Sequence, residues 1–397
     1  MGGKKKAEKK KKGLGAEKTA QKTEKKLSAK MRKELALQGE EDIETLVARF
    51  SAEDAKKSCK TITEIPLTDR PSKRSNFSLV AHPNKDQLLM FGGECIVNKS
   101  TTVYSDFLCF DIKKQKWTQW ECSGGPPPRA AHQAVTIAGD GGQMWMFGGE
   151  FVTPSESQFY HYRDLWVFHF KDRRWEKIEV KGGPSGRSGH RMVVLYTPNL
   201  PPRVAIFGGF HDSLRGDCRY YNDFYIFDLS ERLWRKLEIT GTPPAPRSGH
   251  LMAALNDGRI YIHGGFSKVK APSKKKGFDD ETGVVHADSF FLTPDKRDTT
   301  GTKFKWIQAK TTGSVPSKRC SSTLVAWTES GKNSALVFGG VHDDEEQEVL
   351  SDSSDEEEEV STVQRFQVSK ARSNFLREEL FRASAVCGCK LYDGSGG

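Results

Sequence analysis

Three histidines occupy the same place in three consecutive segments of the sequence, each three residues after an arginine. They are His132, His190 and His250. Repeated imidazoles at equivalent places could hold a transition metal, because a neutral imidazole nitrogen is a common metal ligand. The two flanking segments have Phe77 and Ser322 at this place, and no acidic ligand recurs beside the histidines. We therefore expect structural histidines that bond to neighbouring backbone, and no metal site.

The arginines of the same segments, with two neighbouring serines, are the candidate partner contacts. A guanidinium group can bind a carboxylate through two parallel hydrogen bonds, so a ring of arginines could hold an acidic peptide. The alternative is that each arginine ties a loop to its own segment or to the next one, and we favour this alternative for any single residue. The candidate contacts are Arg129, Arg187, Ser188, Arg247, Ser248 and Arg319.

Patterns for enzymatic chemistry are missing from the sequence. It contains no Gly-rich phosphate loop, no nucleophile elbow and no paired-carboxylate constellation. The eight cysteines show neither paired zinc spacing nor a disulfide framework. We expect a reduced, intracellular protein of the cytoplasm, the nucleus or both, with no cofactor and no enzymatic activity. No apolar run approaches the length of a membrane span, so we expect no membrane partner.

The arginines and histidines belong to a repeat that covers most of the chain. An apolar strand closed by two glycines occurs five times, and its second glycine stands at positions 93, 149, 209, 265 and 340. An aromatic-acidic segment such as Tyr162-Arg163-Asp164-Leu165-Trp166 follows each of the first four copies. A single tryptophan then closes each of these four repeats: Trp117, Trp175, Trp234 and Trp306. This order, at a period near fifty residues, is the kelch pattern.

The repeat predicts an all-β fold, a kelch β-propeller whose four-stranded blades stack because no blade can cover its own faces. Residues 71–342 hold these repeats, but after Gly340 neither the aromatic-acidic segment nor the tryptophan follows. The sequence therefore predicts about four and a half blades. An unclosed propeller exposes strand edges, so we expect this chain to be less stable than a closed relative and prone to aggregate or to pair in trans.

Charged segments flank the repeats. Residues 1–33 hold 13 Lys and one Arg against three Glu, and should be disordered. This basic tail is either a nuclear-localisation or RNA-contacting segment or a solubilising leader, and its RNA contact would be non-specific because it lacks aromatic residues. Residues 34–70 predict an acidic amphipathic helix and a linker.

The C-terminal part of the chain changes character. Residues 343–359 form an acidic, disordered run with 11 Asp or Glu, and residues 360–397 form an atypical tail. Ser353 and Ser354 each have a glutamate three residues further on, which makes them phosphorylation candidates for an acid-directed kinase.

Several motifs together carry a family resemblance. They are Phe-Gly-Gly-Glu at positions 91–94 and 147–150, Gln158-Phe159-Tyr160-His161-Tyr162, and Ser185-Gly186-Arg187-Ser188-Gly189-His190-Arg191-Met192. With the lysine-rich head and the acidic helix they resemble the Kelch domain-containing protein 4 family and its fungal kelch-repeat relatives, over residues 1 to about 345. The resemblance implies a six-bladed, non-enzymatic propeller with an acidic C-terminal region. The last segment departs from that pattern, which suggests a truncated or alternatively spliced product.

The sequence leaves more than one function open. The first is a protein-interaction scaffold whose propeller surface binds a partner protein, such as an acidic peptide. The alternative is a substrate receptor of a ubiquitin ligase, which ranks lower because no BTB domain lies upstream and no convincing cullin-adaptor box is present. A third is an RNA- or ribosome-associated factor, which depends wholly on the basic tail. The fold alone predicts none of these functions.

Overall fold

The computed structural model describes residues 41–56, 62–197, 200–212, 218–271, 280–310, 312–313, 317–329 and 332–341. The predicted basic tail of residues 1–33, the acidic run of residues 343–359 and the tail of residues 360–397 lie outside the described residues. The phosphorylation candidates Ser353 and Ser354 lie outside them as well.

A single described helix precedes the sheets. Helix α2 (Ile43–Lys56) belongs to a unit of its own, Met1–Lys57, and has Glu44 in its first turn, where a carboxylate suits the positive end of the helix dipole. This helix lies within residues 34–70, the segment for which the sequence predicts an acidic amphipathic helix and a linker. Among the described residues no helix has the length and hydrophobicity needed to cross a bilayer.

The described residues of the second unit, Ser58–Gly397, form antiparallel four-stranded blades and one further hairpin, and the all-β kelch propeller fold is confirmed. Blade 1 contains β2 (Ser78–Ala81), β3 (Gln87–Phe91), β6 (Phe107–Asp111) and β7 (Lys116–Glu121). Blade 2 contains β8 (Gln133–Ile137), β9 (Gln143–Phe147), β12 (Leu165–His169) and β13 (Arg174–Ile178). Blade 3 contains β14 (Arg191–Leu195), β15 (Arg203–Phe207), β18 (Phe224–Asp228) and β19 (Leu233–Arg235). Blade 4 contains β21 (Leu251–Ala254), β22 (Ile260–His263), β25 (Ser289–Pro294) and β26 (Lys303–Gln308).

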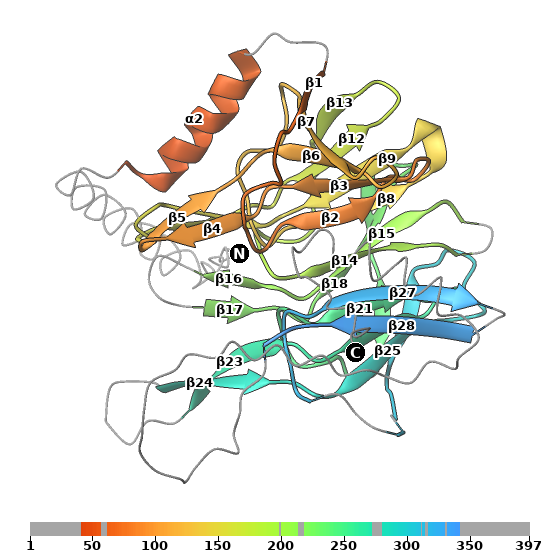
Figure 1. Ribbon diagram of the computed structural model, residues 1–397. Helices are drawn as coiled ribbons and strands as arrows, with labels where there is room; N and C mark the ends of the chain where they lie inside the picture. Colours follow the sequence, from red (N-terminus) through yellow and green to blue (C-terminus); the bar gives the residue numbers. More distant parts are fainter. Residues whose placement is uncertain are drawn as a thin grey trace, which may run out of the picture. The chain divides into compact units, whose positions relative to one another are not determined.

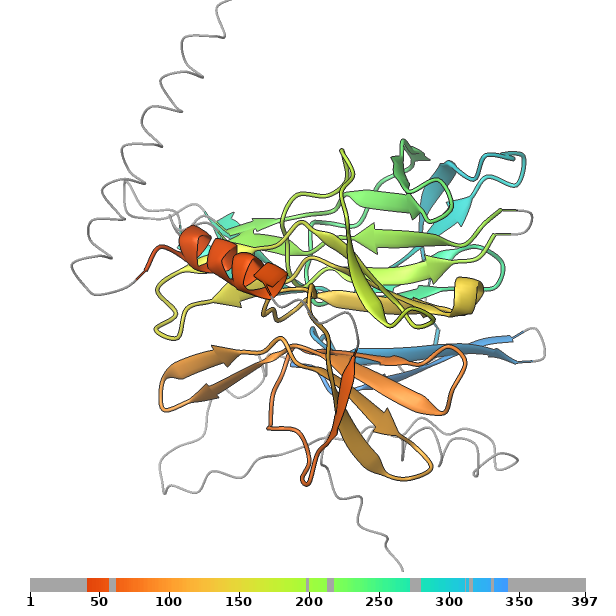
Figure 2. The same cartoon turned by 90° about the horizontal axis from the view of Figure 1, so that it is seen from above.

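The fifth repeat contributes only a hairpin to the described residues. Strands β27 (Thr323–Glu329) and β28 (Lys332–Phe338) pair with each other in antiparallel register and form a sheet of two strands. Figure 2 shows this hairpin in blue as a two-stranded ribbon. It corresponds to the first two strands of the blades before it, because β28 ends on the fifth pair of glycines, as β22 ends on the fourth.

Two short strands extend the outer edges of blades. Strand β1 (Thr63–Pro66) pairs antiparallel with β7, and β20 (Glu238–Thr240) pairs parallel with β26. The sequence assigns residues 63–66 to a linker, so β1 is a difference from that expectation. All four residues of β1 are exposed, and a strand of this kind forms through its ladder hydrogen bonds rather than through a buried apolar face.

A second kind of hairpin connects the second strand of each blade to the third. We call these four hairpins the hairpin row, and Figure 1 shows three of them, β4–β5, β16–β17 and β23–β24, projecting on the same side of the blades. The hairpins are β4 (Glu94–Val97) with β5 (Ser100–Val103), β10 (Glu150–Val152) with β11 (Phe159–His161), β16 (Phe210–Asp212) with β17 (Cys218–Tyr220), and β23 (Phe266–Ala271) with β24 (Asp280–Val285). All four begin directly after a pair of glycines.

The core lies between neighbouring blades. The closing tryptophan of blade 2, Trp175, is 7% exposed and packs with its ring centroid 5.6 Å from Phe91 and 5.3 Å from Phe107 of blade 1. Trp306 of blade 4 packs in the same way on Phe207 of blade 3, at 5.4 Å. The tryptophans of blades 2, 3 and 4 thus cover the apolar face of the preceding blade, which that blade cannot cover by itself, whereas Trp117 packs on Phe110 of its own blade.

A chain of backbone hydrogen bonds links the turns that enter the innermost strands. The amide of Ala131 donates to Asn76 O at 2.8 Å, Gly189 to Ala131 O at 3.0 Å, Gly249 to Gly189 O at 2.8 Å, and Ser321 to Gly249 O at 2.7 Å. All five residues have φ between 51° and 60°, the left-handed region. Each blade therefore fixes the turn of the next, from blade 1 to the β27–β28 hairpin.

Candidate protein-interaction face

The arginine that enters each blade is bonded within its own blade. In blade 3, Arg187 donates from Nη1 to Gly208 O at 3.0 Å, and its two Nη groups bind both carboxylate oxygens of Asp223 at 2.5 and 3.0 Å. The guanidinium also lies 4.0 Å from the ring centroid of Tyr221, within cation–π range. The same bidentate arrangement joins Arg129 to Asp164 and Arg247 to Asp288.

These ion pairs are buried on the arginine side. The side chains of Arg129, Arg187 and Arg247 are 0% exposed. Burial alone would raise the pKa of Asp164, but the charge and the hydrogen bonds of Arg129 outweigh it and hold this pKa below its usual value. The pair is therefore ionised at neutral pH and fastens the turn before β8 to the start of β12.

The burial changes the role of most of the candidate partner contacts. Arg129, Arg187 and Arg247, with Ser188 at 0% and Ser248 at 8% exposure, offer no surface to a partner in this arrangement. The alternative interpretation, in which each arginine ties a turn to its own blade, agrees with these contacts. Arg319 differs, because it is partly exposed and binds no carboxylate among the described residues.

The three repeated histidines pack beneath glycines. A Cβ on Gly92 would lie 3.2 Å from Cε1 of His132, whose ring stands edge-on to Phe91 at 5.7 Å. Burial, assisted by the charge of Arg129, lowers the pKa of His132 to about 3, so the ring is neutral. Its Nε2 bonds to the hydroxyl of Ser78 at 2.8 Å rather than to backbone. His190 and His250 stand edge-on to Phe147 and Phe207 in the same way.

A buried cluster that the sequence did not indicate joins blades 2 and 3. Ser188 Oγ donates to Glu150 Oε2 at 2.9 Å and lies 3.2 Å from His161 Nδ1, while the amide of Asp212 donates to His161 Nε2 at 2.9 Å. Burial lowers the pKa of His161 to about 3, so the ring is neutral. Because Nε2 accepts a hydrogen bond from the Asp212 amide, the proton of the ring lies on Nδ1. The Ser188 hydroxyl therefore has no imidazole base to activate it, and this Ser, His and Glu set does not form a nucleophilic triad.

Glu150 should make the stability of the protein depend on pH. Burial raises the pKa of Glu150 from 4.5 to about 7, so the folded state holds this proton more tightly than the unfolded chain does. The resulting stability is present below pH 4.5 and is lost as the pH rises through about 7. We expect wild type to lose on the order of 2 kcal/mol relative to Glu150→Gln between pH 5 and 8, measured by urea denaturation.

The control for this experiment is the equivalent position of blade 1. Glu94 follows the first pair of glycines as Glu150 follows the second, but its hydrogen bond with Asn76 Nδ2, at 2.6 Å, is exposed to solvent, whereas the bond of Glu150 with Ser188 is partly buried. The free energy of unfolding of Glu94→Gln should therefore change with pH in parallel with that of wild type over the same range. Parallel curves for wild type and Glu150→Gln would show instead that Glu150 is ionised in the folded protein throughout.

Neighbouring hairpins of the hairpin row contact one another. The amide of Thr101 in β5 donates to Pro154 O at 3.0 Å, which joins the first hairpin to the second. The bond from Asp212 to His161 joins the second to the third, and the Tyr220 and Phe266 rings, 6.1 Å apart, join the third to the fourth. The four hairpins therefore form one continuous surface beside the pairs of glycines.

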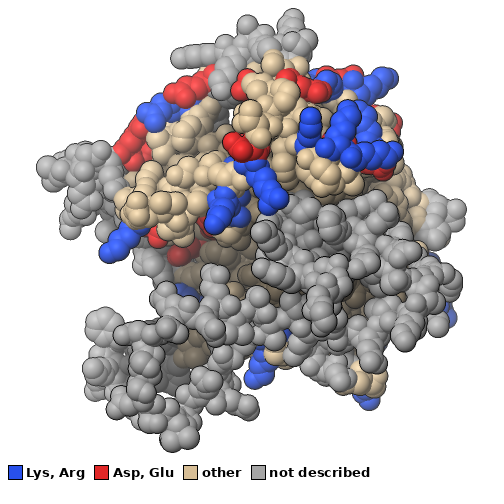
Figure 3. Space-filling view, in the orientation of Figure 1, with Lys and Arg blue, Asp and Glu red and all other residues tan. Residues whose placement is uncertain are grey.

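Apolar side chains are exposed along this surface. Ile96 is 63% exposed and Val97 58% exposed at the tip of the β4–β5 hairpin, and Phe159 in β11 and Val269 in β23 are 36% and 46% exposed. The exposed basic residues Lys99, Arg219 and Lys268 lie on the same hairpins. Among the coloured residues of Figure 3, both basic and acidic side chains lie on the face shown, together with larger uncharged areas.

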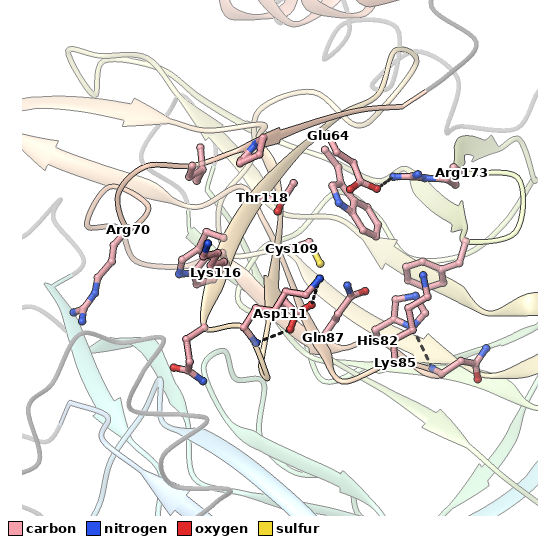
Figure 4. A pocket seen from close by; sticks show the side chains of 18 of the residues that line it. Glu64, Arg70, His82, Lys85, Gln87, Cys109, Asp111, Lys116, Thr118 and Arg173 are labelled. Carbon is pink, nitrogen blue, oxygen red and sulfur yellow. Dashed lines mark hydrogen bonds and ion pairs between the residues drawn. The ribbon is translucent and has the colours of Figure 1, made fainter.

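A cavity of about 1050 Å³ lies at the opposite ends of the strands, between blades 1 and 2 (Figure 4). Six basic and three acidic side chains line it, and the acidic Glu64 pairs with Arg173. Burial raises the pKa of Cys109 to about 12, and burial with the nearby charge of Lys85 lowers the pKa of His82 to about 4. The thiol is thus protonated at neutral pH and supplies no nucleophile.

Comparison with known proteins identifies the repeats. The family model described as KLHDC2/KLHL20/DRC7 Kelch-repeats domain matches residues 56–265 and 184–354. Kelch repeat-containing protein 2 of Saccharomyces cerevisiae is 31% identical over 146 residues, which cover 35% of this chain and 15% of that protein. Adagio-like protein 3 of Oryza sativa subsp. japonica is 26% identical over 234 residues, which cover 58% of this chain and 31% of that protein. The flagellar outer-arm dynein alpha chain of Chlamydomonas reinhardtii is 28% identical over 172 residues, which cover 42% of this chain and 4% of that protein.

The chain matches less than a third of the length of each of these relatives. Among solved structures, that of YjhT superposes with a TM-score of 0.44 and 16% identity, covering 69% of this chain and 74% of that one.

Proposed function

Because the chain belongs to the KLHDC2/KLHL20/DRC7 kelch-repeats domain family, we propose that it is a non-enzymatic protein-interaction scaffold that binds a partner protein through the hairpin row. Its finer place is in the Kelch domain-containing protein 4 family, a proposal that rests on the motifs at positions 158–162 and 185–192.

The observation that carries the proposal is the continuous line of hairpins, three of which expose apolar side chains: Ile96 and Val97, Phe159, and Val269. Exposed apolar groups that cluster on a surface mark interaction sites more often than scattered ones do. The rigid base beneath them supports the same proposal, since the buried arginine pairs fix the start of each third strand. A surface held in this way loses little entropy when a partner binds.

The chemistry of the row selects the kind of partner. Ile96, Val97 and Phe159 offer apolar contacts, and Lys99 adds a positive charge two residues after Val97. Arg219 adds a second positive charge on the third hairpin, and Glu156 adds a negative charge on the second. A segment that combines apolar side chains with carboxylates complements this surface, because opposite charges guide the encounter and apolar burial contributes affinity.

The test is affinity capture with a tip variant. We expect Ile96→Ser/Val97→Ser/Phe159→Ser to lose at least about tenfold in the yield of specific partners, because apolar anchors at an interface each contribute on the order of 1–2 kcal/mol. Its melting temperature should stay close to that of wild type, because these side chains are exposed and lie outside the core.

The matched control removes exposed side chains elsewhere in the propeller. Tyr196 is 57% exposed and Ile307 is 46% exposed, and neither lies in the hairpin row. Tyr196→Ser/Ile307→Ser should capture the same partners as wild type. If the control loses the partners while the tip variant keeps them, the hairpin row is not the binding face.

A further inference from the structure

One edge of strand β28 has no paired strand among the described residues, whereas the same edge of each equivalent strand is paired with the third strand of its blade. The second strand of each complete blade pairs on one side with the first strand and on the other side with the third. Thus β12 covers β9, β18 covers β15 and β25 covers β22. Among the described residues, β28 pairs with β27 alone. An uncovered edge of this kind can accept a strand from another protein.

The arginine that enters the fifth repeat, Arg319, makes the same backbone hydrogen bonds as its counterparts in the complete blades. Arg319 donates from Nε to Ser317 O at 3.3 Å and from Nη1 to Gly339 O at 2.9 Å. Arg187 makes the same two bonds, to Ser185 O at 3.1 Å and to Gly208 O at 3.0 Å. Arg187 has in addition the carboxylate of Asp223, which the third strand of its blade supplies. Arg319 has no carboxylate partner within the described part of the chain.

The backbone next to Arg319 also has the geometry of a complete blade. Gly339 and Gly340 have φ values of 68° and 94°, against 68° and 96° for Gly208 and Gly209. A Cβ on Gly339 would meet nothing within 4 Å, whereas one on Gly208 would lie 2.6 Å from Arg247 O. The side chains beside them are uncovered too, since Phe338 is 50% exposed and its counterpart Phe207 is 0% exposed.

We propose that the edge of β28 is an acceptor site for an extended segment of a partner protein, which binds antiparallel to β28 and places an aspartate on Arg319. This surface is separate from the hairpin row. The chain itself contains four examples of the segment that fits, one in each complete blade. They are Tyr104-Ser105-Asp106-Phe107, Tyr162-Arg163-Asp164-Leu165, Tyr221-Asn222-Asp223-Phe224 and His286-Ala287-Asp288-Ser289.

The register follows from the complete blades. In blade 4, His263 pairs with Ser289, so Asp288 lies opposite the first glycine, Gly264, whose amide donates to its carbonyl at 3.2 Å. The partner's aspartate therefore belongs opposite Gly339, with its next residues opposite Phe338, Val337, Leu336 and Ala335. An aromatic residue two positions before the aspartate would lie over Arg319, as Tyr104 lies over Arg74 at 3.7 Å.

Backbone hydrogen bonds and one ion pair have different roles in recognition of the segment. The ladder of β28 gives affinity for any extended segment, whereas the guanidinium selects a carboxylate at one position of the segment. The attraction is strongest for a bidentate pair, which neither asparagine nor a displaced aspartate reproduces. The site therefore distinguishes segments by the place of a single acid.

The test uses the full chain and a fluorescent peptide with the sequence of residues 220–229, which contains the aspartate of blade 3. A second peptide has the substitution Asp223→Asn, and fluorescence anisotropy measures both. We expect the asparagine peptide to bind roughly tenfold or more weakly, because a hydrogen-bonded charge pair is removed. The protein variants are Arg319→Gln and, as the matched control, Lys318→Gln, which removes one exposed charge from the neighbouring residue.

A double-mutant cycle separates this site from non-specific binding. Arg319→Gln should weaken the aspartate peptide by the same factor and should no longer distinguish the two peptides, whereas Lys318→Gln should behave like wild type. Circular dichroism checks that both variants keep their strands. Equal affinities of the two peptides for wild type, or no binding of either one, would overturn the proposal. A dimer that Arg319→Gln dissociates in light scattering would assign the edge to a second copy and overturn the partner assignment.

Discussion

Arg129→Met should lower the free energy of unfolding by about 3–5 kcal/mol, because removing one member of a buried ion pair leaves the other charge without compensation. Arg129 is 0% exposed and gives both its Nη groups to Asp164, at 2.8 and 2.9 Å. Methionine retains most of the volume, so the loss reports the charge rather than a cavity. Urea denaturation at neutral pH measures the change.

Two further variants identify the cause of the loss. Arg163 is exposed and adjoins Asp164 in sequence, so Arg163→Met makes the same chemical change outside the pair and should cost less than about 0.5 kcal/mol. Adding Asp164→Leu to Arg129→Met removes the uncompensated carboxylate and should restore part of the stability. If Arg129→Met were as mild as Arg163→Met, the arginine would not fasten the blade.

Gly149→Ala should cost at least about 3 kcal/mol, since it combines backbone strain with a collision. Gly149 has φ of 94°, and a Cβ there would lie 2.7 Å from Ala130 O and 2.7 Å from Cβ of His132. These atoms belong to the turn entering blade 2, which the arginine pair holds in place. Thermal melting of the variant should show a large decrease or a failure to fold.

The control for this substitution is Gly182→Ala. Gly182 has a similar φ of 83°, but a Cβ there would meet nothing within 4 Å. Its cost should be that of the backbone conformation alone, about 1–2 kcal/mol. Equal losses for Gly149→Ala and Gly182→Ala would mean that the turn gives way to the added methyl group and does not hold the blade rigidly.

The strands that end on paired glycines could be predicted, because their signal is local. The run Met144 to Phe147 is apolar and closed by Gly148-Gly149, and β9 spans Gln143–Phe147. The closing tryptophans could be predicted for the same reason, since each recurs at a fixed place in its repeat. The contact of Trp175 with Phe91 needed the stacking of blades, which the repeat implies.

The pairing of the arginines with aspartates could not be read from spacing alone. Arg129 and Asp164 are 35 residues apart and meet because β9 lies between the strands that follow them. Both residue types stood out in the sequence, but only the order of the strands brings them together. For the same reason the sequence made the arginines candidates for binding a carboxylate of a partner protein. In the structure, three of them bind an aspartate of this chain instead.

The hairpin row and the edge strands gave weaker signals. The segment between glycines and third strand varies in length and has no periodic pattern, so its short strands did not emerge from the sequence. Strand β1 is exposed throughout and forms only because β7 offers an edge. The Glu150 cluster joins residues of two blades, and only its position after a pair of glycines marked Glu150 beforehand.

The most direct test of the scaffold account is hydrogen exchange of the full chain, alone and with the partner recovered by capture. If the hairpin row binds the partner, exchange should be slower in the hairpins, at positions 94–103, 150–161 and 266–271, when the partner is bound. Slower exchange confined to the opposite ends of the strands, at positions 82–87, 112–116 and 170–173, would contradict this account and assign binding to the cavity side.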